Sequence, residues 1–231
     1  MTHLNAIVEG DAEERFVNEV LSPHLRGFGI TTSASKVVTS GRRGNAAAQG
    51  GGRRYGHWKD DLSSWIKAQG RNRDVWFTTM LDYYGLGAFV DDFPGYGQTA
   101  GERRAVDRVA KLESAWANDI NFDRFIPYLQ IHEFEALLLV KCEVFKEIFI
   151  EESDAVDDLS ADLRSTGKTP EEINDGKTTA PSKRIINHLP AYKVRKGSAG
   201  PLAAAKIGLP ALRRACPHFN KWLSSLESLK A

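Results

Sequence analysis

The sequence is poor in cysteine and has no long apolar run, and both shortages narrow the class of protein. Only Cys142 and Cys216 occur, and neither forms a CxxC pair or stands beside a histidine at the spacing of metal ligands. We therefore expect buried thiols. The longest apolar run, residues 136–140, falls far short of the roughly 20 residues that span a bilayer. The chain starts without a positive flank or a signal-peptide cleavage site, so we expect a cytoplasmic protein with no membrane contact.

Acidic residues are missing from two segments, although the total charge is nearly balanced at +1. None occurs between Ser40 and Lys59, and from Lys183 to the end ten basic residues face one acid, Glu227. The basic residues of the first segment are Arg42, Arg43, Arg53, Arg54 and Lys59. Such segregation favours contact with a polyanion, and a solvated surface explains it equally well.

Strand and helix patterns alternate along the first part of the chain. Apolar alternation or continuous apolar residues predict strands at residues 4–8, 30–39, 75–81 and 125–131. Helical spacing predicts helices after Asp11, around Trp58 and over residues 100–119. Because this alternation is typical of parallel βαβ units, we expect an α/β fold with a parallel sheet of about four strands flanked by helices.

The composition changes near residue 142. Beyond it the chain becomes acidic, then loop-like, and then shows short helical patterns separated by proline and glycine. We therefore predict two parts: an α/β core over residues 1–142 and a mainly helical, loop-rich C-terminal extension over residues 143–231.

Three carboxylates are expected at the carboxyl edge of the sheet, where ligands bind in parallel α/β folds. Glu9 follows the first predicted strand, Asp82 ends the third, and Glu13 lies in the first helical turn after Glu9. Carboxylates gathered together repel one another, so a cluster of anions requires a cation. An all-oxygen donor set favours Mg²⁺ or Mn²⁺. Helix capping by Glu13 and a solvated turn at Glu9 are the structural alternatives.

The sequence HEFEALLLV offers further acids. A helix predicted from His132 places Glu133 and Glu135 beside leucines, where a bare carboxylate is costly, so each is a candidate metal ligand or a partner in a structural ion pair. His132 is a candidate general acid or base, or a hydrogen-bonded structural histidine. Ala136 stands where HExxH requires its second histidine, which excludes that zinc motif.

The glycine-rich basic segment lacks GxxxxGK[ST], which excludes a nucleotide-binding P-loop. Its arginines suit phosphate contact instead. The candidate nucleic-acid contacts are Arg42, Arg43, Arg53, Arg54, Lys183 and Arg184, with further cations at residues 193–196. Exposed helix ends explain the later group comparably well.

The motifs VEGDAEERFV, TTMLDYYGL, RFIPYLQIHEFEALL, APSKRI and CPHFNKWL span nearly the whole chain. Together they resemble an uncharacterised bacterial family with a Toprim-like core, the fold of topoisomerases, bacterial primases and overcoming-lysogenization-defect (OLD) nucleases. The resemblance implies that Glu9 and Asp82 handle metal and phosphate, and the OLD-type pattern adds Glu13. Tyr84 replaces the second aspartate of the Toprim Asp-x-Asp pair, which argues against a full two-metal site.

Three functions are consistent with these residues. The first is a Mg²⁺- or Mn²⁺-dependent nuclease that acts on DNA or RNA. The second is a non-catalytic partner of an ATPase encoded separately, since OLD nucleases carry an ATPase that this chain lacks; the resemblance implies a role in defence against phages or plasmids. The third, a small-molecule phosphotransferase, would show no salt-dependent binding of nucleic acid.

Overall fold

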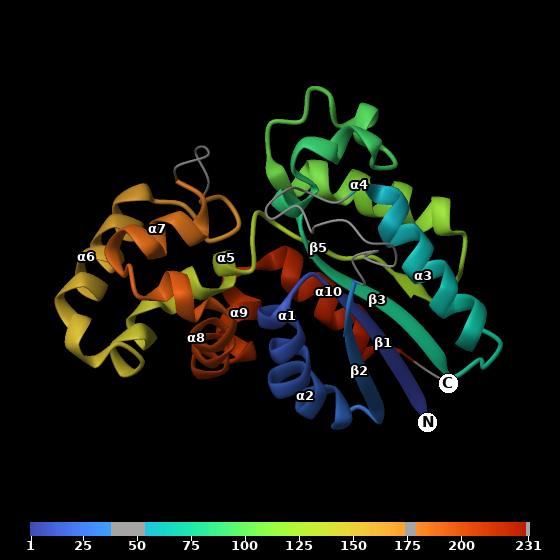
Figure 1. Cartoon of the computed structure of the whole chain (residues 1–231), viewed down its shortest axis with the longest axis horizontal. Helices are drawn as coiled ribbons and strands as arrows, with labels where there is room; N and C mark the ends of the chain where they lie inside the picture. The colour runs from blue at the N-terminus through green and yellow to red at the C-terminus, as the bar shows by residue number, and fades with distance from the viewer. Residues whose placement is uncertain (38–53, 174–178, 230–231) are drawn as a thin grey trace, which may run out of the picture.

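A computed structural model of the chain describes residues 1–37, 54–173 and 179–229. Its strands are β1 (Thr2–Val8), β2 (Ile30–Lys36), β3 (Val75–Asp82), β4 (Phe125–Ile126) and β5 (Leu129–Gln130). They pair in the order β2-β1-β3-β4, β5 also pairs with β3, and every pairing is parallel (Figure 1). The predicted α/β fold with a parallel sheet is confirmed.

The predicted strand at residues 125–131 is interrupted. Pro127 has no N–H to donate, and at this point the Thr79 hydroxyl accepts a hydrogen bond from Tyr128 N (2.9 Å) and donates one to Tyr128 O (3.0 Å). β4 and β5 keep the same register against β3 on either side of the break. They therefore act as one strand that delivers the chain to the carboxyl edge of the sheet.

Helices cover both faces of the sheet, as amphipathic patterns in βαβ units require. The helices of the first half are α1 (Asp11–Phe16), which continues through a π-helical turn (Val17–Leu21) into α2 (Ser22–Arg26), then α3 (Tyr55–Gln69) and α4 (Ala105–Ile120). Two 3-10 segments, Tyr83–Asp92 and Tyr96–Thr99, follow β3. Leu4, Ala6 and Val8 of β1 pack against α1 and α2, while α3 and α4 enclose a second apolar cluster around Phe77 and Leu81.

The C-terminal half is mainly helical. It comprises α5 (Glu135–Leu138), 3-10 segments Leu139–Glu147 and Ile150–Glu152, α6 (Ser153–Thr166), α7 (Pro181–His188), α8 (Tyr192–Ile207), α9 (Leu209–Ala215) and α10 (Pro217–Glu227). α6 to α9 form a lobe beside the sheet (Figure 1), whereas α10 packs on the sheet itself. Trp222 of α10 donates to the Thr78 hydroxyl at 2.9 Å and stacks on Tyr128. Apolar packing is therefore continuous across residue 142, and the division into two parts there stays a prediction.

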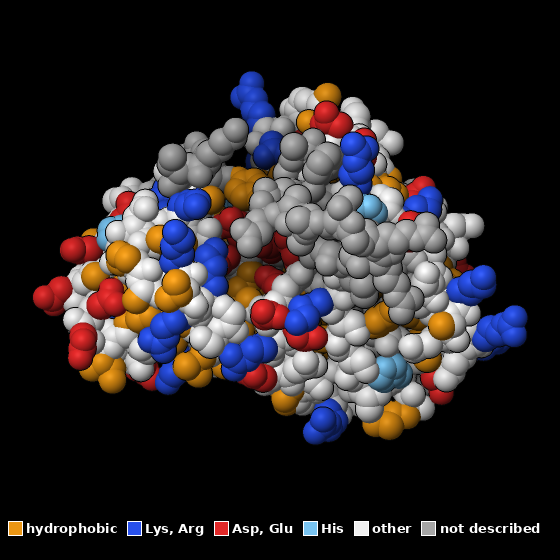
Figure 2. Space-filling view, in the orientation of Figure 1, with side chains coloured by type: hydrophobic (Ala, Val, Ile, Leu, Met, Phe, Trp, Pro, Cys, Tyr) orange, Lys and Arg blue, Asp and Glu red, His pale blue; other side chains and the backbone are white. Residues whose placement is uncertain are grey.

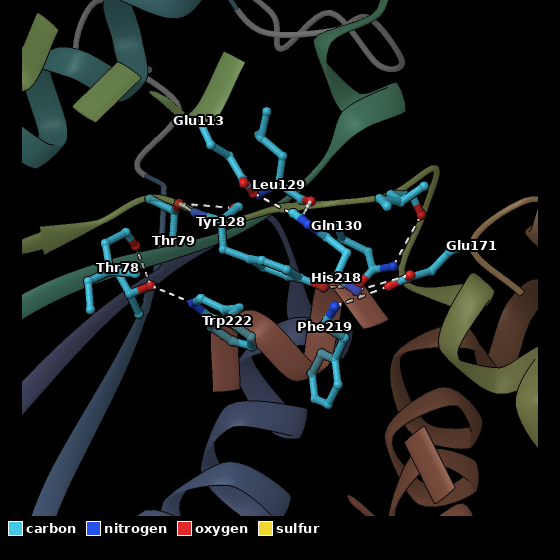
Figure 3. Close-up of polar contacts among 12 residues, drawn as sticks. Thr78, Thr79, Glu113, Tyr128, Leu129, Gln130, Glu171, His218, Phe219 and Trp222 are labelled. Carbon is cyan, nitrogen blue, oxygen red and sulfur yellow. Dashed lines mark hydrogen bonds and ion pairs between the residues drawn. The ribbon is translucent and has the colours of Figure 1, made fainter. Parts of the chain in front are cut away.

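A buried glutamate ties α10 to the carboxyl edge of the sheet. Glu171 accepts hydrogen bonds from the backbone N–H groups of His218 and Phe219, both at 3.1 Å, and so caps the first turn of α10 (Figure 3). Its carbonyl accepts a hydrogen bond from His132 Nε2 at 3.1 Å. This pair of contacts fixes the segment that leads into α5. No helix in the described part of the chain has the length and apolar composition of a membrane span.

Candidate functional site

The sheet brings Glu9 and Asp82 together, as the sequence predicts. β1 and β3 are parallel neighbours, so their carboxyl ends meet at one edge, and Glu9 Oε2 accepts a hydrogen bond from the Asp82 backbone N–H at 2.9 Å. The two side chains line an open cavity of about 280 Å³. The other residues of its wall are Asp11, Ala12, Glu13, Phe134, Glu135, Lys196 and Gly197. We call Glu9, Glu13, Asp82, Glu133 and Glu135 the acidic cluster.

Glu13 is the third carboxylate at this edge. It is 6% exposed, and its Oε2 accepts a hydrogen bond from Gly10 N at 3.0 Å, which closes the first turn of α1. Burial raises the pKa of Glu13 to about 7, and the nearby charges of Glu9 and Glu135 add to the rise. The capping role set out as the alternative and membership of the cluster therefore hold together for this side chain.

Asp82 is the acid whose pKa is affected by every other member of the cluster. Burial raises its pKa well above the ordinary value, and the charges of the other four cluster members raise it further, Glu9 most. Its Oδ1 oxygen is enclosed and has no hydrogen-bond partner in the described part of the chain. Since buried acceptors are normally paired, this oxygen lacks the donor or cation that its position calls for.

The remaining two acids come from a different local structure than expected. The helix does not begin at His132: that residue has a φ of 66° and α5 starts only at Glu135, so the predicted helix start is wrong. Glu133 lies before α5, and its Oε2 accepts a hydrogen bond from Ser182 N at 2.9 Å, in the first turn of α7. Glu135 Oε1 faces the cavity and contacts Lys196 Nζ at 3.0 Å.

The surroundings of His132 do not suit a general acid or base. It is 4% exposed, and burial lowers its pKa to about 4, so the ring is neutral at neutral pH. Because its Nε2 lies 3.1 Å from the Glu171 carbonyl, the neutral ring carries its hydrogen on that nitrogen. This placement favours the structural histidine that we set out as the alternative.

Lys196 and Tyr192 of α8 are site residues that sequence reasoning missed. The sequence suggested residues 193–196 as further cations for nucleic-acid contact, and not as part of the acidic site. Arg15 of α1 donates to the Gly197 carbonyl at 3.2 Å, which holds α8 against α1 and turns Lys196 into the cavity. The Tyr192 hydroxyl lies 3.3 Å from Glu135 Oε1. No local pattern connects α8 with Glu9, so the sequence offers no signal for this contact.

The donor set of the cluster fits a hard divalent cation. Carboxylate oxygens are the ligands that Mg²⁺ and Mn²⁺ prefer. In the cluster, Asp82 Oδ1 has no hydrogen-bond partner among the described residues and is therefore available as a metal ligand. Within the described ranges, no three carboxylate, histidine or cysteine side chains are arranged so that they hold an ion as they stand. Binding therefore requires that the carboxylates rotate toward the ion, Glu9 by giving up its hydrogen bond to Asp82 N.

Of the six predicted nucleic-acid contacts, the structure describes Arg54, Lys183 and Arg184. Arg42, Arg43 and Arg53 lie outside the described residues. Arg54 is exposed and 3.4 Å from Asp92, and Lys183 is exposed on α7. Arg184 has a side chain only 11% exposed and pairs with Asp162 at 2.6 Å, a structural arrangement. Figure 2 shows acidic side chains in a hollow between the sheet and the C-terminal helices, with Lys and Arg side chains along the rim on the side of α7 and α8.

The absence of a side chain at Gly85 leaves room for the Glu9 carboxylate. A Cβ at residue 85 would lie 2.6 Å from Glu9 Oε1, too close for two atoms that are not bonded. Because the end of a glutamate side chain moves easily, we expect Gly85→Ala to leave the thermal midpoint nearly unchanged while displacing Glu9. Titration with Mn²⁺ should then show an affinity roughly tenfold lower than wild type, the size of effect that mispositioned ligands produce. Unchanged affinity would remove Glu9 from the site.

Comparison with known proteins assigns the chain to a family. A family described as a domain of unknown function (DUF4276) matches residues 8–227. Among solved structures, the C-terminal region of the Burkholderia pseudomallei OLD protein is 16% identical, with 97% of this chain and 96% of that one covered and a TM-score of 0.43. The C-terminal region of the Xanthomonas campestris pv. campestris OLD protein is 15% identical, with 97% of this chain and 98% of that one covered and a TM-score of 0.37. None of the curated proteins compared with the chain matches it. The match over residues 8–227 shows that the chain belongs to the DUF4276 family.

Proposed function

We propose that the acidic cluster binds Mg²⁺ or Mn²⁺ and that the protein is a metal-dependent nuclease. The observation that carries this proposal is the enclosed, unpartnered Asp82 Oδ1 among four other carboxylates at the carboxyl edge of a parallel sheet. Holding such a cluster without a cation is costly, whereas a divalent ion converts the repulsion into ligation. An oxygen-ligated ion of this kind polarises a phosphoryl oxygen and lowers the pKa of a bound water, which are the requirements of phosphodiester hydrolysis.

Four of the five cluster residues have a direct role in this proposal, and Glu133 is held by Ser182 N outside the cavity wall. Glu9, Asp82 and Glu13 hold the ion, and Glu135 with Lys196 forms the opposite wall of the cavity. When bound, the ion supplies a water of lowered pKa and neutralises charge on the phosphate. Lys196 donates to a phosphate oxygen of the substrate once the strand enters the cavity. The Toprim-like arrangement, with Tyr84 in place of a second aspartate, corresponds to one ion rather than two.

The test is cleavage of DNA and RNA with Mg²⁺ or Mn²⁺ by the wild type, Glu9→Gln and a matched control, Glu151→Gln. Glu151 is exposed in the segment Ile150–Glu152, away from the cavity wall. Since an ion stabilises the transition state by several kcal/mol, we expect Glu9→Gln to lose at least about 100-fold in rate, and the control to retain the wild-type rate. Equal cleavage by all three proteins, or none by the wild type on any substrate, contradicts the assignment.

A non-catalytic subunit of an ATPase complex is the second candidate. It is favoured by the absence of a P-loop from the sequence together with the resemblance to OLD nucleases, in which an ATPase accompanies the Toprim core. In this case the protein acts in defence against phages or plasmids through an ATPase supplied separately. Affinity purification of the tagged chain from its native cells, followed by mass spectrometry, should recover an ATPase. Repeated recovery of the chain without one rejects this candidate.

A further inference from the structure

We propose that Tyr83 and Tyr84 form a platform on which a nucleobase of the substrate stacks, and that the substrate is therefore single-stranded nucleic acid. This inference rests on the proposed function, because it concerns the strand that the acidic cluster would act on. It assigns a role to the residue that departs from the Asp-x-Asp pattern.

The platform is a row of rings next to the acidic cluster. Tyr83 and Tyr84 follow Asp82 directly at the end of β3, and their ring centroids are 6.0 Å apart with an interplanar angle of 33°. The Tyr84 ring lies 5.4 Å from that of His132, at 46°. A backbone hydrogen bond from Tyr84 N to His132 O, at 3.0 Å, fixes the end of the row. The rings thus lie directly after Asp82, beside the proposed ion site.

Tyr84 differs from every other tyrosine of the chain. The six tyrosines all lie in the described ranges, and five have a polar partner for the hydroxyl group. These partners are Asp119 for Tyr55, Arg108 for Tyr83, Asp91 for Tyr96, Gln130 for Tyr128 and Glu135 for Tyr192. The Tyr84 hydroxyl has no hydrogen bond to any described residue, and the side chain is only half-buried. The Tyr84 ring is therefore placed by its contacts with the rings of Tyr83 and His132, and part of it stays exposed.

Charge around the row suits a nucleotide. The Arg108 guanidinium lies over the Tyr83 ring, 6.0 Å from its centroid, and donates to the Tyr83 hydroxyl at 3.2 Å. Tyr84 lies beside Tyr83 in the row, so Arg108 places its positive charge at the Tyr83 end of the row. Arg108 is thus a cation beside the row for a phosphate that flanks a stacked base.

Stacking on a side chain selects the form of the nucleic acid. In a continuous duplex the faces of the bases are covered by their neighbours, so an aromatic platform is accessible only to unpaired or extruded bases. Stacking is tolerant of sequence because every base has an aromatic face. The arrangement therefore predicts a preference for single strands without a strong preference for sequence.

The experiment measures binding rather than cleavage. The probes are a fluorescein-labelled single-stranded DNA of about 12 nucleotides, an RNA of the same sequence, the matching duplex, and a DNA strand with abasic sites, all with Ca²⁺ in place of Mg²⁺. Anisotropy titrations compare the wild type, Tyr84→Ala and Tyr84→Phe. We expect single strands to bind at least about tenfold more tightly than the duplex, and Tyr84→Ala to lose about tenfold on single strands, the size of one lost stacking contact.

Two further results separate stacking from a structural role. Tyr84→Phe should bind like the wild type, because it keeps the ring, and Tyr84→Ala should bind the abasic strand no more weakly than the wild type does. Duplex binding as tight as single-strand binding, or equal loss on abasic and intact strands, overturns the inference. If Tyr84→Ala does not fold, Tyr84→Phe and the abasic strand still decide it. Tyr84-dependent binding without cleavage refutes only the nuclease, whereas duplex cleavage unaffected by Tyr84→Ala refutes only the platform.

Discussion

Asp82→Asn is expected to make the metal-free protein more stable and to lower its affinity for Mn²⁺ at least about 100-fold. At pH 8 the unfolded chain carries Asp82 as a solvated anion, whereas the native protein must either keep that charge among four other carboxylates or take up a proton. Both options lower the free energy of unfolding. Asparagine carries no charge and takes up no proton, so the variant avoids both costs. We expect a gain of about 1 kcal/mol or more, which raises the thermal midpoint by about 2–4 °C in a domain of this size.

The same substitution removes a charged ligand from the proposed ion. Changes to groups that only orient a ligand already cost about 10- to 100-fold in metal affinity, so we expect a loss of at least about 100-fold here. Thermal denaturation over a series of Mn²⁺ concentrations measures both effects, because an ion that binds only the native state raises the midpoint with its concentration. Asp158→Asn, an exposed position on α6, is the matched control and should behave like the wild type. An Asp82→Asn protein that Mn²⁺ stabilises as it does the wild type excludes a metal site at this edge.

The sequence alone predicted that Glu9 and Asp82 lie at one edge of the sheet, because the carboxyl ends of neighbouring parallel strands lie side by side. Residues 4–8 and 75–81 have the apolar character of buried strands, and parallel strands place the residues that follow them at one edge. Glu9 and Asp82 therefore meet without any knowledge of the turns between them, as the contact from Asp82 N to Glu9 Oε2 shows. Glu13 follows from the turn of helix that begins at Asp11.

The opposite wall of the cavity was not predictable in this way. Lys196 reaches Glu135 because α8 packs against α1, and Glu133 is held by the first turn of α7. These are contacts between segments far apart in sequence, set by side-chain packing rather than by a local pattern. The late start of α5 has the same origin, since His132 is held in a left-handed conformation by contacts with Tyr84 and Glu171.

The stability of the metal-free protein is expected to depend on pH through Glu13. The pKa of Glu13 is 4.5 in the unfolded chain and about 7 in the native protein. Between these values the native state binds more protons than the unfolded state, so the free energy of unfolding falls as the pH rises and levels off above pH 7. Such a shift corresponds to about 3 kcal/mol. His132, with its pKa lowered to about 4, acts in the opposite direction, because stability is lost as the pH falls from 6.5 toward 4.

The contribution of Glu13 is isolated by comparison of the wild type with Glu13→Gln, because His132 is common to both. Glutamine still accepts the hydrogen bond from Gly10 N but does not titrate, so the variant should be more stable than the wild type at pH 8 and nearly equal to it at pH 4. Urea unfolding in EDTA at several pH values measures this difference. Glu151→Gln, an exposed position away from the cavity, should follow the wild-type curve. A Glu13→Gln protein that is less stable than the wild type at pH 8 would mean that Glu13 acts there as an anion with a compensating partner, and the acidic cluster would then need no ion to balance it.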